Sequence, residues 1–193
     1  NLAFDKIEIF YRKNKNSTSS EFLHINKINS LKRVKKNIIK NDIKKIVSRR
    51  KNILGLKFNK PQIMGVLNIT PDSFSDGGLF YKDSKSFKHA KKMINEGAVI
   101  IDIGGESTRP GSNTIKDKRE WERVKKTIIK LKKKFPSVIL SLDTRKSYVM
   151  LKGIEKGINI INDVSGLEFD KKSFSVISSK KTPFILHHMQ GTP

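Results

Sequence analysis

The sequence contains no cysteine, and this absence removes several kinds of chemistry. Without cysteine there is no disulfide framework, thiolate metal site or cysteine nucleophile, and a reducing, cytoplasmic compartment is the simplest setting. No apolar run approaches the roughly 20 residues that span a bilayer, so we expect no membrane insertion. Acidic residues are also scarce, because 18 Asp and Glu stand against 41 Lys and Arg, which gives a formal net charge of +23.

The excess of basic residues invites a nucleic-acid-binding interpretation, because basic domains attract phosphate backbones through counterion release. The lysines, however, are spread along most of the 193 residues, together with many isoleucines and asparagines. This distribution indicates a compositional bias, and charge by itself bears on solubility and non-specific attraction. We therefore expect no dedicated nucleic-acid surface, while anionic small-molecule substrates remain compatible with the charge.

The chain divides into two zones, and we assign residues 1–60 to a basic N-terminal extension of unknown role. We expect it to contain, in order, a strand KIEIFY, a polar break RKNKNSTSS, a surface helix LKRVKKNIIKNDIKKIVSRRKN and an alternating strand ILGLKF. The last segment could lie across one end of the domain that follows. No catalytic pattern occurs in this zone.

Residues 61–193 form the second zone, in which apolar and amphipathic segments alternate. The apolar segments are QIMGVLNI, AVIIDIGG, SVILSLDT, INIINDV and PFILHHM. They are mostly continuous, as in parallel strands that are covered on both sides, and the segments between them have helical apolar spacing. Such repeats predict an α/β fold, either an open doubly wound sheet or a (β/α)₈ TIM barrel.

Each apolar segment is followed directly by a polar cluster. The clusters are NITPDSFSDGG, GGESTRPGS, DTRKS, NDVSG and HHMQGTP. In a barrel the C-terminal ends of all strands surround one site, whereas an open sheet uses only the ends near its switch point. Five converging clusters, and no G-x-G-x-x-G after the first strand, favour the barrel.

From about residue 61 to 193 the motifs MGVLNITPDSFSDGG, DIGGESTRPG, SLDTRKS, IINDVSG and HHMQGTP resemble the dihydropteroate synthase family of pterin-binding TIM barrels. The resemblance implies a transferase of folate biosynthesis and a target of sulfonamides. In this family 4-aminobenzoate displaces pyrophosphate from 6-hydroxymethyl-7,8-dihydropterin diphosphate, giving 7,8-dihydropteroate. The implied route is largely dissociative, with Mg²⁺ helping pyrophosphate to leave, so charge must be neutralised on the leaving group.

The first motif supplies three residues to this implied site. Asn68 matches the family's Mg²⁺ ligand, and an Asn that caps a turn is the structural alternative. Asp76 matches a catalytic carboxylate near the developing cation, although an Asp before two glycines is also common in turns. Phe74 is expected to form a wall of the arylamine site.

The second and third motifs supply the substrate-binding groups. Arg109 offers a fork of donors suited to pyrophosphate and is the second implied catalytic residue, while Thr108 and Pro110 lie beside it at the aminobenzoate site. Asp143 is a lone carboxylate after a very apolar strand and needs a partner. The 2-amino and ring N–H edge of a pterin would suit it, and a salt bridge to one of the two basic residues of DTRKS is the alternative.

The last two motifs complete the implied pterin site. Asn162 can read another edge of the pterin, whereas Asp163 is expected to hold the strand end in place. His187 stands where the family usually has a methionine that packs on the pterin, and we keep it among the substrate-binding residues. A metal site made with His188 is disfavoured, because adjacent residues of a strand point to opposite faces.

The family's later motifs, which carry a lysine and an arginine of the site, have no counterpart before Pro193. We therefore expect a barrel that is truncated after about five parallel strands. Such a chain has open strand edges and lacks two substrate-binding cations, so we expect it to be inactive on its own.

Two other functions stay open. A pterin-binding domain of a corrinoid-linked methyltransferase would share Asp143 and Asn162 but would not need the TPDSFSDGG and STRPG loops. A non-enzymatic basic binding protein on a degenerate barrel would show salt-dependent retention on nucleic acid. The sequence also leaves open whether another folate enzyme precedes this chain and whether it forms a homodimer.

Overall fold

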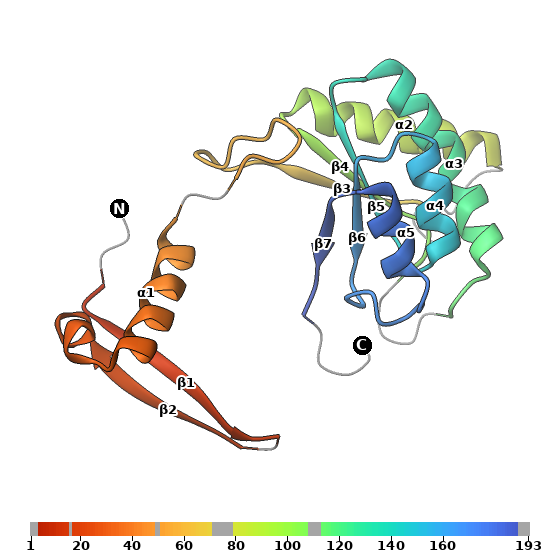
Figure 1. Cartoon of the computed structure of the whole chain (residues 1–193). Helices are drawn as coiled ribbons and strands as arrows, with labels where there is room; N and C mark the ends of the chain where they lie inside the picture. The colour runs from red at the N-terminus through yellow and green to blue at the C-terminus, as the bar shows by residue number, and fades with distance from the viewer. Residues whose placement is uncertain (1–3, 16, 49–50, 71–78, 108–112, 189–193) are drawn as a thin grey trace. The chain divides into compact units, whose positions relative to one another are not determined.

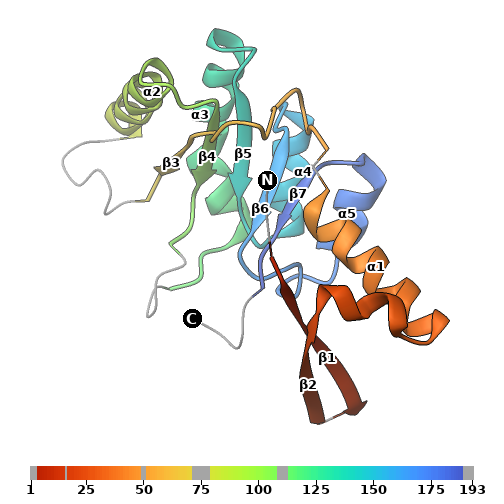
Figure 2. The same cartoon turned by 90° about the vertical axis from the view of Figure 1, so that its left-hand side faces the viewer.

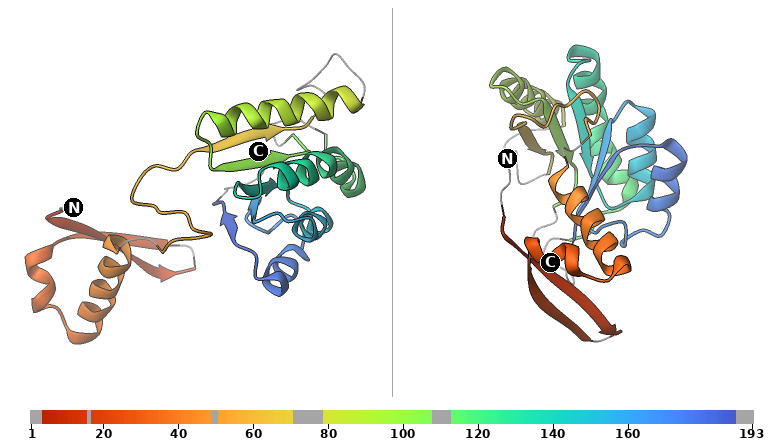
Figure 3. Two further views of the ribbon diagram at one scale, coloured as in Figure 1. Left: turned by 90° about the horizontal axis from the view of Figure 1, so that it is seen from above. Right: turned by 60° about the vertical axis from the view of Figure 1, so that its left-hand side comes forward.

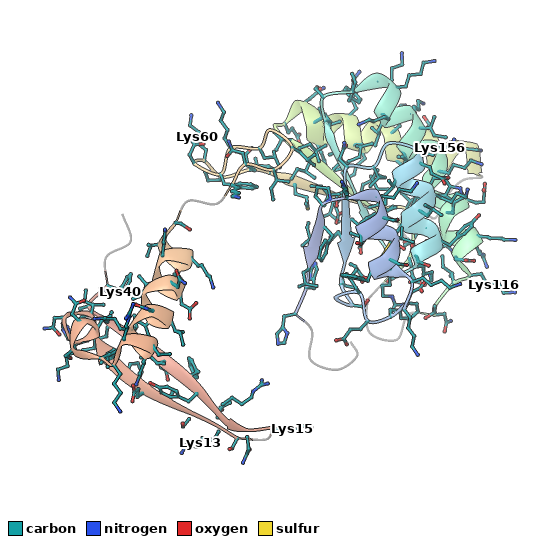
Figure 4. The ribbon with its side chains drawn as sticks, in the orientation of Figure 1. Lys13, Lys15, Lys40, Lys60, Lys116 and Lys156 are labelled. Atoms are coloured by element: carbon teal, nitrogen blue, oxygen red, sulfur yellow. The ribbon has the colours of Figure 1, made fainter. Side chains whose placement is uncertain are left out.

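The computed structural model describes residues 4–15, 17–48, 51–70, 79–107 and 113–188. The chain forms two compact units, Asn1–Lys51 and Asn52–Pro193 (Figure 1). Exposed lysines occur on both units, and Figure 4 labels Lys13, Lys15, Lys40, Lys60, Lys116 and Lys156. In the part of the chain that the structure describes, no helix has both the length and the apolar character needed to cross a bilayer.

The first unit is a hairpin followed by two helices. Its elements are β1 (Lys6–Asn14), β2 (Ser17–His24), the 3₁₀ helix η1 (Ile25–Ser30) and α1 (Arg33–Val47). The strands pair antiparallel, and the pairing includes Arg12 with Thr18 and Asn14 with Ser17. The expected polar break is therefore wrong, because cross-strand pairing holds these polar residues in extended conformation. The expected helix is present, with Ile39 as its buried residue.

The two compact units meet between Lys51 and Asn52, whereas the sequence-based boundary was placed after residue 60. The segment ILGLKF is a turn with one isolated bridge between Ile53 and Leu56, and Leu54 and Gly55 have positive φ angles of 52° and 79°. Leu56 is buried and packs against the first residues of three strands of the second unit, namely Ile100, Ile139 and Ile160. This segment therefore does lie across one end of the second unit, although it is not a strand.

The second unit contains a parallel sheet in the order β3-β4-β5-β6-β7 (Figures 1 and 2). The strands are β3 (Met64–Asn68), β4 (Ile100–Gly104), β5 (Ile139–Asp143), β6 (Ile160–Asp163) and β7 (Phe184–Leu186). Each strand pairs with its neighbour in sequence, so this sheet has no topological switch point of the doubly wound kind. The expected α/β fold with five parallel strands of a partial TIM barrel is confirmed.

Four helices alternate with these strands and lie along one side of the curved sheet (Figure 3). They are α2 (Leu79–Asn95), α3 (Asp117–Lys134), α4 (Ser147–Glu155) and α5 (Ser173–Lys180). The main core fills the space between helices and sheet, and its fully buried side chains include Ile101, Ile103, Leu140, Leu142, Val124, Ile128 and Leu131. This covered face anchors the strands, and the opposite face is left to carry the site.

β3 and β7 form the two edges of the sheet. Among the described residues, no further strand pairs with either edge. Val66, in the middle of β3, is 57% exposed, which is unusual for an apolar residue of a parallel strand.

Candidate functional site

The uncovered face of the sheet changes from apolar to polar along the strands. Residues that pair across parallel strands point to the same face, so the strand register defines rows of side chains. The first row is Met64, Ile100 and Ile139. The second row is Val66, Asp102, Ser141 and Ile160. The third row, at the C-terminal ends of the strands, is Asn68, Gly104, Asp143 and Asn162. The register thus brings three predicted site residues into one row.

Gly104 leaves a gap between Asn68 and Asp143. A Cβ atom at position 104 would lie 3.2 Å from Asn68 Oδ1 and 3.4 Å from Asp143 Oδ2. Asn68 and Asp143 therefore approach each other from the two strands that flank β4. The 3.2 Å distance is tighter than most real Cβ contacts and the 3.4 Å distance is an ordinary one, so glycine at position 104 mainly leaves room for Asn68 Oδ1 beside Asp143.

Asp143 is a half-buried acid that forms no ion pair with another described residue. Its Oδ1 atom is buried and has no hydrogen-bond partner among the described residues. Burial is the main cause that raises the pKa of Asp143 to about 7, and the negative charge of Asp102 adds to the shift. The alternative of a salt bridge to Arg145 or Lys146 is not what the structure shows, because both of those cations pair with Glu106.

This raised pKa predicts a specific pH dependence of stability. An Asp in an unfolded chain has a pKa of about 3.9, so Asp143 contributes stability that is fully present below about pH 4 and lost as the pH rises to about 7. Asp143→Asn cannot ionise and should lack this decline. Thermal unfolding of both ligand-free proteins at about pH 5 and pH 8 measures the difference. A parallel decline in both proteins would contradict the assignment.

A chain of hydrogen bonds crosses the polar rows. Asn162 Nδ2 donates to Asp102 Oδ2 at 2.8 Å, and His187 Nε2 lies 2.8 Å from Asn162 Oδ1. Asp102 is only 5% exposed, and its Oδ1 atom has no partner among the described residues. Asp102 is not among the site residues predicted from the sequence, although a single acid inside the apolar run AVIIDIGG is a signal for it.

Asp163 has the structural role that was expected. Its carboxylate accepts hydrogen bonds from the Ser165 N–H at 2.8 Å, the Ser165 hydroxyl at 2.7 Å and the Leu167 N–H at 3.1 Å. It is fully buried and faces away from the polar rows. Asp163 therefore fixes the turn after β6, while Asn162 next to it faces the site.

Beside the site lies a buried ion cluster that the sequence did not reveal. Lys146 Nζ lies 2.7 Å from Glu106 Oε1 and 2.6 Å from Glu120 Oε2, and Arg145 lies 3.1 Å from Glu106. Glu106 also accepts a hydrogen bond from the Ile115 N–H. Burial by itself would raise the pKa of Glu106, but the hydrogen bonds from Lys146 and Ile115 outweigh it, so this pKa lies below its ordinary value.

Five predicted site residues lie outside the described part of the chain. They are Phe74, Asp76, Thr108, Arg109 and Pro110. Their proposed roles stay predictions.

The polar row also contains an oxygen that suits a divalent cation. In the described part of the chain, no three His, Asp or Glu side chains come together in a way that could hold a metal ion. Mg²⁺, however, commonly binds through one or two protein oxygens together with water and substrate phosphates. Asn68 Oδ1, beside the gap above Gly104, is an oxygen of this kind, so the residues present fit such an ion.

Three comparisons relate the chain to known proteins. Residues 64–193 match the model of the pterin binding enzyme family. A dihydropteroate synthase of Bacillus subtilis is 42% identical over 147 residues, which make up 76% of this chain and 51% of the relative. The chain therefore spans about half the length of this curated relative.

Two solved structures resemble the fold. A Clostridium difficile dihydropteroate synthase, determined in the presence of pteroic acid, matches with a TM-score of 0.66 and 43% identity, covering 70% of this chain and 51% of that one. A Xanthomonas albilineans dihydropteroate synthase with 4-aminobenzoic acid matches with a TM-score of 0.66 and 38% identity, covering 70% and 49%.

Proposed function

Since this chain belongs to the family of pterin-binding enzymes, we propose that it acts as a dihydropteroate synthase in folate biosynthesis. The proposed reaction condenses 6-hydroxymethyl-7,8-dihydropterin diphosphate with 4-aminobenzoate, giving 7,8-dihydropteroate and pyrophosphate. The observation that carries the proposal is the polar row at the C-terminal strand ends, within the segment that matches the family. The lack of cysteine agrees with a cytoplasmic setting, which is part of the same proposal.

In this proposal the pterin binds between Asp102, Asp143 and Asn162. Asp102 and Asp143 each have a buried carboxylate oxygen without a partner among the described residues. Buried acceptors of this kind favour a ligand that brings N–H donors, because leaving them unpaired costs free energy. The 2-amino group and the ring N–H of a pterin are two such donors on one flat edge. Their binding would favour the ionised form of Asp143 and lower its pKa.

Mg²⁺ completes the proposed site on the side of β3. Asn68 would hold the ion through Oδ1, and the substrate diphosphate and water would supply the remaining ligands. When bound, the ion would neutralise the charge that develops on the departing pyrophosphate. Asn68 would hold this cation beside the pterin and would not contact the pterin ring.

The remaining assignments rest on the motif resemblance. Arg109 and Asp76 are the two proposed catalytic residues. Arg109 would bind pyrophosphate, and Asp76 would stabilise the developing cation. Phe74, Thr108 and Pro110 are proposed to line the aminobenzoate site, where sulfonamides would compete. His187, which directly follows β7, is proposed to belong to the pterin-binding site.

The role of Asn68 predicts a separation between turnover and binding. Asn68→Ala, made in the protein from the complete reading frame that encodes this chain, should lower kcat by about tenfold or more. Binding of 6-hydroxymethylpterin without its diphosphate should change little, because Asn68 acts at the cation. Asn68→Asp, which keeps an oxygen ligand, serves as the control and should retain more activity. Equal losses in kcat and in binding of the diphosphate-free pterin would contradict the role.

The function itself is tested by comparing residues 1–193 with the complete reading frame. Pyrophosphate release that depends on 4-aminobenzoate and is inhibited by sulfonamides is expected from the complete protein. Residues 1–193 alone should show less than about a tenth of this rate, because open sheet edges destabilise the site. Equal rates from the two proteins would refute the proposed inactivity of the short chain. Pterin binding by the complete protein without aminobenzoate-dependent turnover would instead favour a methyltransferase-type pterin domain.

A further inference from the structure

The hydrogen-bond chain through Asn162 ends on His187, a residue at the C-terminal end of β7. His187 Nε2 lies 2.8 Å from Asn162 Oδ1, and Asn162 Nδ2 donates to Asp102 Oδ2 at 2.8 Å. Asp102 lies in the middle of β4, Asn162 near the end of β6, and His187 directly after β7. Asn162 and Asp102 are 60 positions apart in sequence. The side-chain amide of Asn162 thus connects His187 to the buried carboxylate of Asp102, and these two side chains are joined only through it.

The chemistry of the three groups fixes which atoms donate. An ionised carboxylate only accepts hydrogen bonds, so the amide of Asn162 must turn its NH₂ group toward Asp102. Its oxygen then faces His187 and accepts, so His187 must carry a proton on Nε2. If the amide were reversed, its oxygen would face the Asp102 carboxylate, and this contact between two acceptors would be unfavourable. Its NH₂ group would then face His187 Nε2, which could accept only in the tautomer that carries the proton on Nδ1.

The backbone of His187 is also held in place. Gly166, in the turn after β6, has a φ of +64°, and a Cβ atom there would lie 2.8 Å from the His187 carbonyl oxygen. This distance is shorter than real Cβ contacts allow, so only glycine permits the turn to approach β7 so closely. The turn after β6, which Asp163 fixes, therefore lies directly against the backbone of His187.

We propose that His187 is a positioning residue that determines which edge of a pterin the site accepts. Its Nε2–H holds the Asn162 amide in one orientation, and this orientation keeps Asp102 Oδ2 occupied and Asp102 Oδ1 free for the ligand. One N–H of Asn162 and one lone pair of its oxygen remain available, on fixed sides of the amide. The inference rests on the proposed function for the identity of the ligand, a pterin.

A thioether or an alkyl side chain at position 187 could pack on a ligand but could not donate to Asn162. Without the donor, only Asp102 would orient the amide. The proposal therefore concerns the N–H of this side chain and not its size. Glutamine provides the discriminating substitution, because it carries an N–H donor of its own.

The test compares His187→Gln with His187→Leu in the protein from the complete reading frame. The probe is 6-hydroxymethylpterin, whose dissociation constant is measured by calorimetry, and steady-state kinetics give kcat and the KM of each substrate. His187→Leu should weaken pterin binding about fivefold, the scale of one hydrogen bond, and the loss should appear in the KM of the pterin substrate. His187→Gln should recover most of this loss. His89→Leu, at an exposed histidine of α2, is the matched control and should change neither quantity.

The possible outcomes separate this inference from the proposed function. Equal losses in His187→Gln and His187→Leu, or no loss in either, would overturn the positioning role, and Asp143→Asn would then show whether the pterin site itself stands. Failure of the unaltered protein to bind the pterin would overturn both. If His187→Leu does not fold, His187→Met provides the second variant without a donor, and the same comparison with His187→Gln applies.

Discussion

Replacing Asp143 by Asn is expected to weaken binding of 6-hydroxymethylpterin by about 2 to 4 kcal/mol, or roughly 30-fold to 1,000-fold. The buried Oδ1 atom of Asp143 has no partner among the described residues, and in the proposed complex it accepts an N–H of the pterin. An amide at this position replaces a charged acceptor by a neutral one. It also offers N–H groups that would face the donors of the ligand.

Calorimetry at about pH 8, where Asp143 is ionised, measures this loss most directly. Asp42→Asn, which removes an exposed carboxylate of α1, is the matched control and should change the affinity by less than about 0.5 kcal/mol. If Asp143→Asn also changes the affinity by less than about 0.5 kcal/mol, Asp143 does not contact the pterin. For the unaltered protein, affinity should fall as the pH drops below about 7, because protonation removes the charged acceptor.

Replacing Lys146 by Met is expected to destabilise the folded protein by about 3 to 5 kcal/mol. The Lys146 side chain is 8% exposed, and its partners Glu106 and Glu120 are 4% and 1% exposed. Loss of the cation leaves the buried Glu120 without an ion partner among the described residues and leaves Glu106 paired with Arg145 alone. Because a buried charge without a partner is far more costly than a lost surface contact, this effect should exceed that of any exposed lysine.

Denaturant unfolding of the protein from the complete reading frame measures the change in free energy. Lys152→Met is the matched control, since Lys152 forms an exposed ion pair with Glu155 in α4 and should cost less than about 1 kcal/mol. Adding Glu120→Gln to Lys146→Met should recover part of the stability, because the uncompensated charge is removed. If Lys146→Met and Lys152→Met have equal effects, the cluster does not stabilise the fold.

The strands and helices of residues 61–193 could be predicted from the sequence because their signal is local. A short continuous apolar run such as AVIIDIGG is typical of a strand that is buried on both faces, and the apolar spacing around Val124 and Ile128 is typical of a helix. The predicted strand ILGLKF was wrong, because its local apolar pattern does not match its backbone conformation. Leu54 and Leu56 alternate like strand residues, but positive φ angles make their segment a turn.

The sequence by itself determined that polar clusters follow each strand, and parallel strands bring such clusters to the same edge of a sheet. Asn68, Asp143 and Asn162 were therefore predictable as neighbours, and the register places them in one row. The sequence by itself could not determine which charged groups pair with one another. Asp102 is bound to Asn162 across 60 positions, and Lys146 to Glu106 across 40.

Only the tertiary structure decided these pairings, because they depend on strand register and on the distance between loops that are remote in sequence. Lys146 and Arg145 stand beside Asp143 in sequence, yet both turn to Glu106, so Asp143 keeps a free oxygen and a raised pKa. Electrostatic attraction falls with distance and with exposure to water, so a buried partner a few ångströms away outweighs a sequence neighbour. The family motif thus predicted the site, and the folded register decided which of the described polar groups there have no partner.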